Sequence, residues 1–131
     1  MYAHKKTVKL SYDDAVVKLR DELKKEGFGV ITEIDVRKTI KEKINIEFDK
    51  YVILGACNPS FAHQALLAER DLGLLLPCNV IVYEQNGSTV VASILPTVQM
   101  SKVGNPKFIP LEQQVETKTK ESHRCSLRRR I

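Results

Sequence analysis

The sequence predicts an α+β domain in which duplicated β-α-β units form a mainly antiparallel sheet with helices packed on one side. Strand, helix and strand patterns follow one another twice along the chain, and aligning the two segments places Ala15 on Ala62 and Ile34 on Ile81. A hairpin pattern with an Asn-Gly turn follows the second helix. Repeated strand–helix–strand units that end in a hairpin are typical of helices covering one face of an antiparallel sheet.

The first segment begins with a short alternating strand over residues 7–10. Ser11 then begins a helix, because its hydroxyl and Asp14 three residues later form a capping box. Gly27 ends this helix, since glycine accepts the left-handed backbone found after a helix. The apolar positions with helical spacing are Ala15, Val16, Leu19 and Leu23.

A half-buried strand is predicted over residues 28–36, where apolar side chains alternate with Glu33 and Asp35. Residues 39–46 fit either a short helix or a second strand, and the spacing of Ile40 and Ile44 favours the helix.

The second segment begins with the continuous apolar run at residues 51–56, which is typical of a central strand covered on both faces. Asn58 is an N-cap, and Pro59 occupies the first helical position, where its missing N–H costs nothing. We expect this helix to continue to Leu72 and to end at Gly73.

A hairpin is predicted from strands at residues 79–84 and 89–94, joined by a turn around Asn86 and Gly87 that needs positive φ angles. Pro96 ends the second strand, and a last helix is expected over residues 111–117.

The length of 131 residues suits one domain, which we expect to span residues 1–116 and to be followed by a basic, flexible tail at 117–131. The sequence has no apolar run near the roughly 20 residues that cross a bilayer, and Met1 to Lys6 lack a secretory signal, so a cytoplasmic protein without a membrane partner is expected. Three cysteines are too few for a disulfide scaffold, which favours free thiols in a reducing compartment.

The net charge of +5 does not indicate a nucleic-acid binder, because of where the charges lie. Six of the 21 basic residues and one of the 16 acids fall in residues 117–131, so the other 116 residues hold 15 of each. A neutral domain has no excess charge with which to follow a phosphate backbone, and the absence of Trp removes a base-stacking side chain. Nucleic acid is therefore not an expected partner.

Cys57 comes directly before the predicted helix start at Asn58, where unpaired N–H groups and the helix dipole stabilise an anion. A thiolate there would be reactive, whereas a thiol that merely finishes a buried strand is inert. Both interpretations stay open. Cys78 follows Leu76-Pro77 at the start of a buried strand, and the structural interpretation is favoured for it.

A metal site made of Cys57, His63 and Cys78 is not predicted, and no cofactor is expected. A helix from Pro59 to Leu72 would be roughly 20 Å long and would carry the two cysteines toward opposite ends of the sheet, unless the Gly73–Pro77 segment doubles back. The spacing Cys-x5-His-x14-Cys matches no common zinc pattern. His63 itself falls on the solvent face of the predicted helix.

Glu69 falls within the apolar stripe of the predicted helix, where burial of an unpaired carboxylate would be costly. Either its carboxylate reaches the sheet edge or a backbone donor, or it lines a polar cleft as a ligand-binding or acid/base group.

Two short motifs, Gly55-Ala56-Cys57-Asn58-Pro59 and Leu76-Pro77-Cys78-Asn79-Val80, occur in this order with Glu69 between them. Together they resemble the DUF302 family of small bacterial and archaeal proteins, and the resemblance spans residues 7–100. It implies a compact α+β domain that forms dimers, with no established activity or cofactor. Relatives commonly end in a longer charged helix, whereas residues 122–131 here form an unpatterned basic tail.

The leading functional hypothesis is a dimeric, non-enzymatic binding module for a small anion or a soft metal, with Cys57, Asn58, Glu69 and Cys78 as candidate ligand-binding residues. The alternative is a thiol-based redox protein or enzyme that uses Cys57. The sequence contains no Gly-rich phosphate loop, nucleophile elbow, HExxH or CxxC motif that would decide between them.

Overall fold

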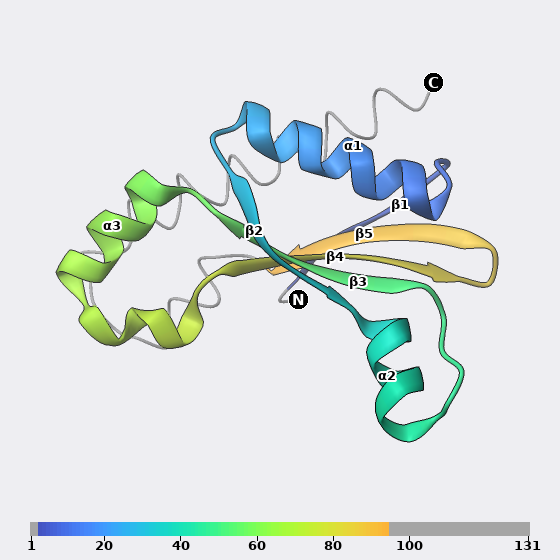
Figure 1. Ribbon diagram of the computed structural model, residues 1–131. Helices are drawn as coiled ribbons and strands as arrows, with labels where there is room; N and C mark the ends of the chain where they lie inside the picture. Colours follow the sequence, from blue (N-terminus) through green and yellow to red (C-terminus); the bar gives the residue numbers. More distant parts are fainter. Residues whose placement is uncertain (1–2, 95–131) are drawn as a thin grey trace.

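The computed structural model describes residues 3–94 of the chain, as an antiparallel sheet with helical segments between its strands (Figure 1). The expected stop at Pro96, the helix predicted over 111–117 and the basic tail lie outside these residues. The elements are β1 (Ala3–Val8), α1 (Tyr12–Lys25), β2 (Gly29–Asp35), α2 (Val36–Ile44), β3 (Tyr51–Cys57), α3 (Pro59–Ala68), the 3-10 helix η1 (Arg70–Leu75), β4 (Cys78–Gln85) and β5 (Ser88–Ile94).

Within the described residues, the sheet has five strands in the order β1-β5-β4-β3-β2, and every neighbouring pair is antiparallel. The predicted α+β class with an antiparallel sheet is thereby confirmed. β1 and β2 form the two edges, so the chain crosses the whole sheet through α1 between them. β3 and β4 are neighbours in the middle.

Helix α1 covers one face of the sheet and closes the main core (Figure 1). Its start is as predicted, since the Ser11 Oγ accepts a hydrogen bond from the Asp14 N–H at 3.1 Å. Gly27 follows the helix with a φ of +85°. Strand residues of one parity point toward α1, as a pleated strand requires. The buried core residues are Val8, Ala15, Leu19, Leu23, Phe28, Val52, Leu54, Ala56, Val80, Val82 and Val91.

The second helical segment does not repeat the position of α1. Because β3 and β4 are adjacent, the chain must return beside the strand that it left, and α3 with η1 forms an arm that projects beyond the end of the sheet (Figure 1). A small separate cluster around Ala65 and Leu72 holds this arm together. The predicted helix over 59–72 is therefore too long: α3 stops at Ala68 and Gly73 lies inside η1.

The helix favoured over residues 39–46 is present as α2, but it begins at Val36. The Asp35 Oδ1 accepts a hydrogen bond from the Lys38 N–H at 3.0 Å and caps the helix earlier than the apolar spacing predicted. Asn45, with a φ of 55°, ends it. α2 buries none of its residues and projects from the body of the protein (Figure 1).

The predicted hairpin is confirmed. β4 and β5 pair continuously, from Val80 opposite Ser93 to Gln85 opposite Ser88. The connecting residues Asn86 and Gly87 have φ angles of 52° and 78°, and two positive φ angles are what a two-residue turn of this kind requires. Within residues 3–94, no helix has both the length and the apolar character to cross a membrane.

Candidate functional site

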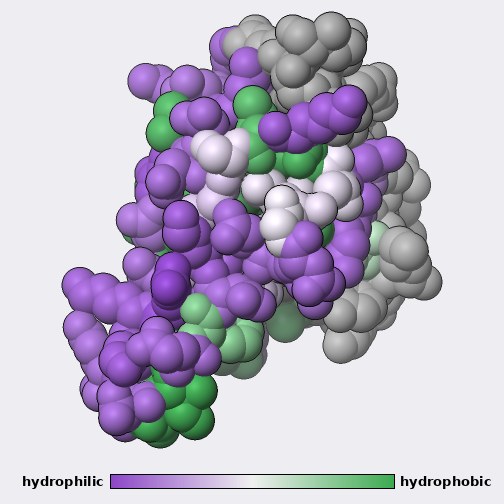
Figure 2. Space-filling model, turned by 90° about the vertical axis from the view of Figure 1, so that its right-hand side faces the viewer, coloured by the Kyte–Doolittle hydropathy of each residue, from purple (hydrophilic) through white to green (hydrophobic). Residues whose placement is uncertain are grey.

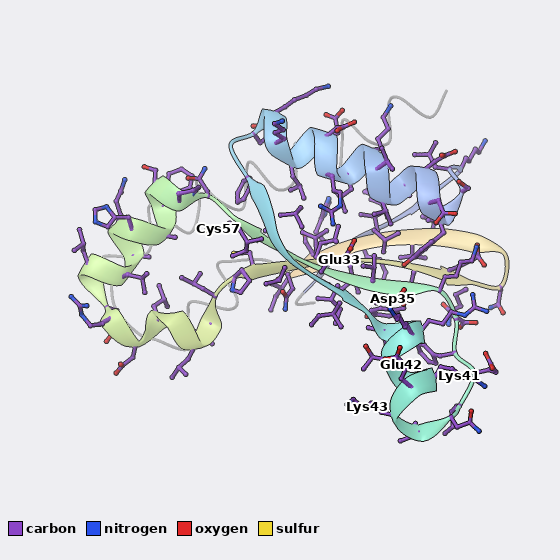
Figure 3. All side chains as sticks on the ribbon, in the orientation of Figure 1. Glu33, Asp35, Lys41, Glu42, Lys43 and Cys57 are labelled. Atoms are coloured by element: carbon purple, nitrogen blue, oxygen red, sulfur yellow. The ribbon has the colours of Figure 1, made fainter. Side chains whose placement is uncertain are left out.

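The start of α3 is built as the sequence predicted. β3 ends at Cys57, and the Asn58 Oδ1 accepts a hydrogen bond from the Phe61 N–H at 3.2 Å. Pro59 occupies the first turn. The turn after α1 packs closely against this cap. A Cβ added to Gly27 would lie only 3.1 Å from the Asn58 Nδ2. Figure 3 shows Cys57 at the root of the projecting arm.

The two cysteines lie at the same end of the sheet, so the favoured expectation of opposite ends is wrong, and the chain instead doubles back before Cys78, the exception that the sequence left open. Ala56, the residue before Cys57, pairs with Cys78 across β3 and β4. The reason is the short α3: after Ala68 the chain folds back through η1 and re-enters the sheet beside the strand that it left. Within residues 3–94, both cysteines are free thiols.

Cys78 packs against the main core, and its burial sets its chemistry. Burial, with a smaller contribution from a negative charge on the neighbouring Cys57, raises the pKa of the Cys78 thiol from 9.0 to about 11. At neutral pH this thiol is therefore protonated, which agrees with the structural interpretation favoured from the sequence. Measured over the whole residue, both Cys57 and Cys78 are half-buried.

Glu69 lies outside the helix in which it was predicted. Its backbone is extended (φ −150°, ψ 105°), and its N–H donates to the Ala65 carbonyl at 2.9 Å, so that it ends α3. Contrary to the prediction, Glu69 therefore does not lie on the apolar face of a helix, because α3 ends before this residue. Glu69 is half-buried, and its role as a ligand-binding group stays a prediction. His63 is exposed, as expected.

The part of the chain that the structure describes contains no group of three or more His, Cys, Asp and Glu side chains placed to hold a metal ion. Cys57 and Cys78 alone could contribute two sulfur ligands. Structural zinc sites use four ligands and catalytic ones three, so these two thiols suit at most a soft ion of low coordination number.

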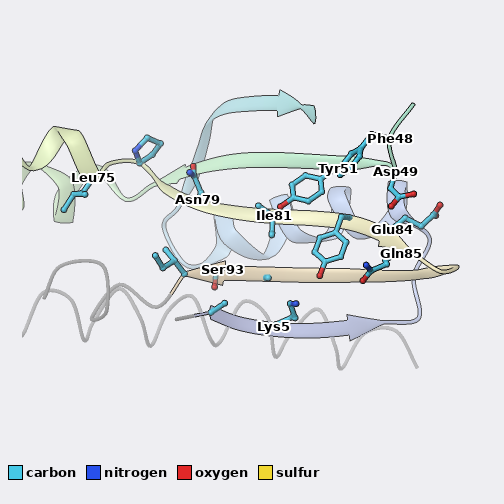
Figure 4. A pocket seen from close by; sticks show the side chains of 15 residues that line it. Lys5, Phe48, Asp49, Tyr51, Leu75, Asn79, Ile81, Glu84, Gln85 and Ser93 are labelled. Atoms are coloured by element: carbon cyan, nitrogen blue, oxygen red, sulfur yellow. The ribbon is translucent and has the colours of Figure 1, made fainter. Parts of the chain in front are cut away.

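A pocket of about 700 Å³ lies on the sheet face opposite α1 (Figure 4). Its strand residues, such as Ile81 and Ala92, have the parity opposite to the core residues Val80, Val82 and Val91. Two tyrosines line it together with apolar and polar residues. The apolar residues are Ala3, Phe48, Leu75, Pro77, Ile81, Ala92 and Ile94, and the polar ones are Lys5, Asp49, Asn79, Glu84, Gln85 and Ser93.

An aromatic row crosses this pocket. Tyr51 and Tyr83 stand directly opposite each other on β3 and β4, and their rings stack with centroids 5.3 Å apart and planes 10° apart. Phe48 extends the row, with its ring centroid 6.2 Å from that of Tyr51. On the other side, the Lys5 Nζ lies 5.9 Å from the centroid of Tyr83. The row thus joins β1, β4, β3 and the segment before β3.

None of the four predicted site residues lines this pocket: Cys57, Asn58, Glu69 and Cys78 belong to the arm and its root. The sequence did contain a signal, because Tyr51 and Ile53 on one strand and Ile81 and Tyr83 on the next share a parity. The continuous apolar run over 51–56 instead predicts a strand covered on both faces. Among residues 3–94, helix α1 packs on one of these faces.

Comparisons with known proteins agree on one family. The model of the family described as "Domain of unknown function DUF302" matches residues 4–123. No curated protein matches the chain. The chain is similar to a solved structure described as that of the uncharacterized conserved protein DUF302 from Bacillus stearothermophilus. The two sequences are 27% identical, the match covers 100% of this chain and 99% of the other, and the TM-score is 0.88.

Proposed function

Because this chain belongs to the DUF302 family, which has no assigned function, we propose that it is a non-enzymatic small-ligand-binding domain that acts as a cytoplasmic homodimer. The observation that carries the ligand-binding part is the pocket on the sheet face. The free thiols of Cys57 and Cys78 suit a reducing compartment.

The pocket supports small-ligand binding by its size and by its lining. Its volume of about 700 Å³ falls within the range of known small-molecule sites. Such sites are mostly apolar with a few polar groups that fix the orientation of the ligand. Here Ile81, Leu75 and the Tyr51–Tyr83 stack provide apolar surface, while Asn79 and Gln85 provide hydrogen-bonding groups.

Filling the pocket should abolish ligand binding. Asn79 is exposed, lines the pocket and lies on a strand, so that Asn79→Trp adds a large side chain to the cavity without disturbing the core. A library of fragment-sized compounds would be screened against the full chain by ligand-observed NMR. We expect the fragments that bind the natural sequence to lose at least about tenfold in affinity with Asn79→Trp.

The matched control is Lys6→Trp, an exposed strand position that does not line the pocket, and its fragment binding should be unchanged. Cys57→Ala combined with Glu69→Gln tests the position predicted from the sequence. Fragments that bind normally to Asn79→Trp but not to the Cys57/Glu69 variant would move the site to the root of the arm.

The homodimer is supported by exposed apolar side chains on and beside the edge strand β2. Ile31 is 62% exposed and Ile34 48%, and Ile44 on α2 and Ile46 in the loop after it are 61% and 53% exposed. The space-filling view in Figure 2 shows hydrophobic residues at the surface of the lower, projecting end of the molecule. An open strand edge with apolar side chains is a template for pairing with another chain. A second copy of this chain is the proposed occupant.

Two charges on this edge should convert the dimer to a monomer. Ile31→Lys with Ile34→Lys is expected to change the mass measured by light scattering after gel filtration from that of two chains to that of one. Val17→Lys, at a 60% exposed position on α1, is the control and should leave the mass unchanged. A natural protein with the mass of one chain would contradict the proposal.

Thiol chemistry at Cys57 is a second candidate function, in redox reactions or in binding a soft metal with Cys78. It is favoured by the position of the two cysteines at one end of the sheet. With its pKa at about 11, roughly one Cys78 side chain in ten thousand is a thiolate at pH 7. We therefore expect iodoacetamide to modify Cys57 at least about tenfold faster than Cys78 in the native protein.

Mass spectrometry of timed samples measures both rates, and equal rates after denaturation serve as the control. Protection of Cys57 by added Zn²⁺ would indicate metal binding. A Cys57 as slow as Cys78 would leave thiol chemistry without support.

A further inference from the structure

We propose that the pocket on the sheet face binds an organic cation, a primary or quaternary ammonium carried on an apolar body. The inference rests on the proposed small-ligand function and adds the chemical class of the ligand. It follows from where the charges, the aromatic rings and the apolar side chains lie around the pocket.

The charged groups of the described lining favour a positive ligand. Two carboxylates, Asp49 and Glu84, lie at the same end of the pocket beside Tyr51 and Phe48 (Figure 4). Within residues 3–94, neither carboxylate takes part in an ion pair. Lys5 is the one basic side chain of the described lining, so acids exceed bases there. A concave site with an excess of one charge attracts ligands of the opposite charge.

The aromatic row already holds a cation. The Lys5 ammonium lies over one side of the Tyr83 ring at 5.9 Å from its centroid, and Tyr51 stacks on the ring as well. An ammonium over an aromatic face is attracted by the electrons of the ring. Lys5 is exposed on the edge strand β1, so its long side chain can withdraw into solvent. A ligand ammonium in its place would gain the same ring contact and the nearby carboxylates.

The opposite end of the pocket suits the body of such a ligand. Leu75 lies there, away from Asp49 and Glu84 (Figure 4). Apolar surface is added to the lining by Pro77, which lies two residues after Leu75 in the segment that returns from the arm, and by Ala92 on β5. Burying an aliphatic chain against these residues is favourable, because apolar surface leaves water. The site therefore combines a cation-binding end with an apolar end.

Three probes with the same six-carbon chain separate charge from apolar burial: hexylammonium, 1-hexanol and hexanoate. Each is titrated into the full chain by isothermal titration calorimetry at low ionic strength. We expect hexylammonium to bind about tenfold more tightly than hexanol, and hexanoate to bind most weakly.

Charge variants then locate the preference. Asp49→Asn with Glu84→Gln should reduce the preference for hexylammonium over hexanol, because both carboxylates become neutral amides of similar size while the ring contact remains. Lys5→Met removes the competing ammonium and keeps an apolar stem, so the affinity for hexylammonium should rise by about threefold or more. Glu42→Gln, at an exposed position on α2 outside the pocket, should change nothing.

The inference is overturned if hexanol or hexanoate binds at least as tightly as hexylammonium, or if Lys5→Met weakens the binding of hexylammonium. It also fails if no hexyl probe binds but library fragments do, and Asn79→Trp abolishes the binding of those fragments. In that case the proposed small-ligand function of the pocket still stands. Failure of both the probes and the fragments overturns the two proposals together.

Discussion

Gly55→Ala is expected to lower the free energy of unfolding by about 1–3 kcal/mol, through overpacking in the middle of the sheet. Gly55 is buried on β3, between Thr32 of β2 and Asn79 of β4. A Cβ at this position would lie 2.7 Å from the Pro77 Cγ and would also collide with the Thr32 side chain. The proline ring cannot rotate away, so the backbone must shift. Urea denaturation of the natural and variant proteins measures the difference.

A matched alanine substitution separates this effect from the loss of a flexible residue. A Cβ on Gly73, in η1, meets no atom within 4 Å, so Gly73→Ala should leave stability unchanged or slightly raise it. Thr32→Ala in the Gly55→Ala background should recover part of the loss, because the hydroxyl contact disappears and the Pro77 contact stays. Equal stability of the two glycine variants would contradict the close approach of Pro77 to β3.

The native state should lose about 2 kcal/mol of stability between pH 9 and pH 11 because of Cys78 alone. Burial raises the pKa of this thiol from 9.0 to about 11. Below pH 9 the thiol is protonated in both the folded and the unfolded chain, and its contribution is fully present. As the pH rises toward 11, the unfolded chain releases the proton first, so unfolding becomes progressively favoured. Urea denaturation at half-unit pH intervals measures the slope.

Cys78→Ala should make the stability profile shallower between pH 9 and 11, and the comparison uses slopes because the substitution also removes core packing. Cys57→Ala is the control and should keep most of the slope, since Cys57 is the smaller cause of the raised pKa of Cys78. Tyr12, whose pKa burial and the nearby Asp35, Asp13 and Glu33 raise to about 12, adds a loss above pH 10 in all three proteins. Parallel profiles for the natural protein and Cys78→Ala would refute this prediction.

Local rules predicted the elements whose ends depend on their own residues. The Ser11 cap, the Asn58–Pro59 helix start and the Asn86–Gly87 turn were each found where a side chain or a φ angle fixes the backbone. Prediction failed at the end of α3, where the apolar stripe and Gly73 both indicated a helix that continues to Leu72. An apolar stripe from Pro59 to Leu72 continues through both α3 and η1, and nothing in that stripe shows that Glu69 leaves the helix.

The candidate site shows the same division. The site residues that the sequence predicts, such as Cys57 and Glu69, adjoin a predicted helix end or lie in a predicted apolar stripe. The pocket depends instead on pairings between distant strands, because Lys5, Tyr83 and Tyr51 come from β1, β4 and β3. Single-strand patterns show which residues share a face, but not which strands are neighbours.

By itself the sequence determined the α+β class, the family resemblance, the capped helix starts and the hairpin, since each rests on residues close together in the chain. The tertiary structure decided that β3 and β4 are adjacent, and the rest follows from that pairing. It brings Cys57 and Cys78 to one end of the sheet, projects α3 and η1 as an arm, and places Pro77 against Gly55. The physical reason is that strand order depends on the packing of the whole chain over one core, which no local pattern contains.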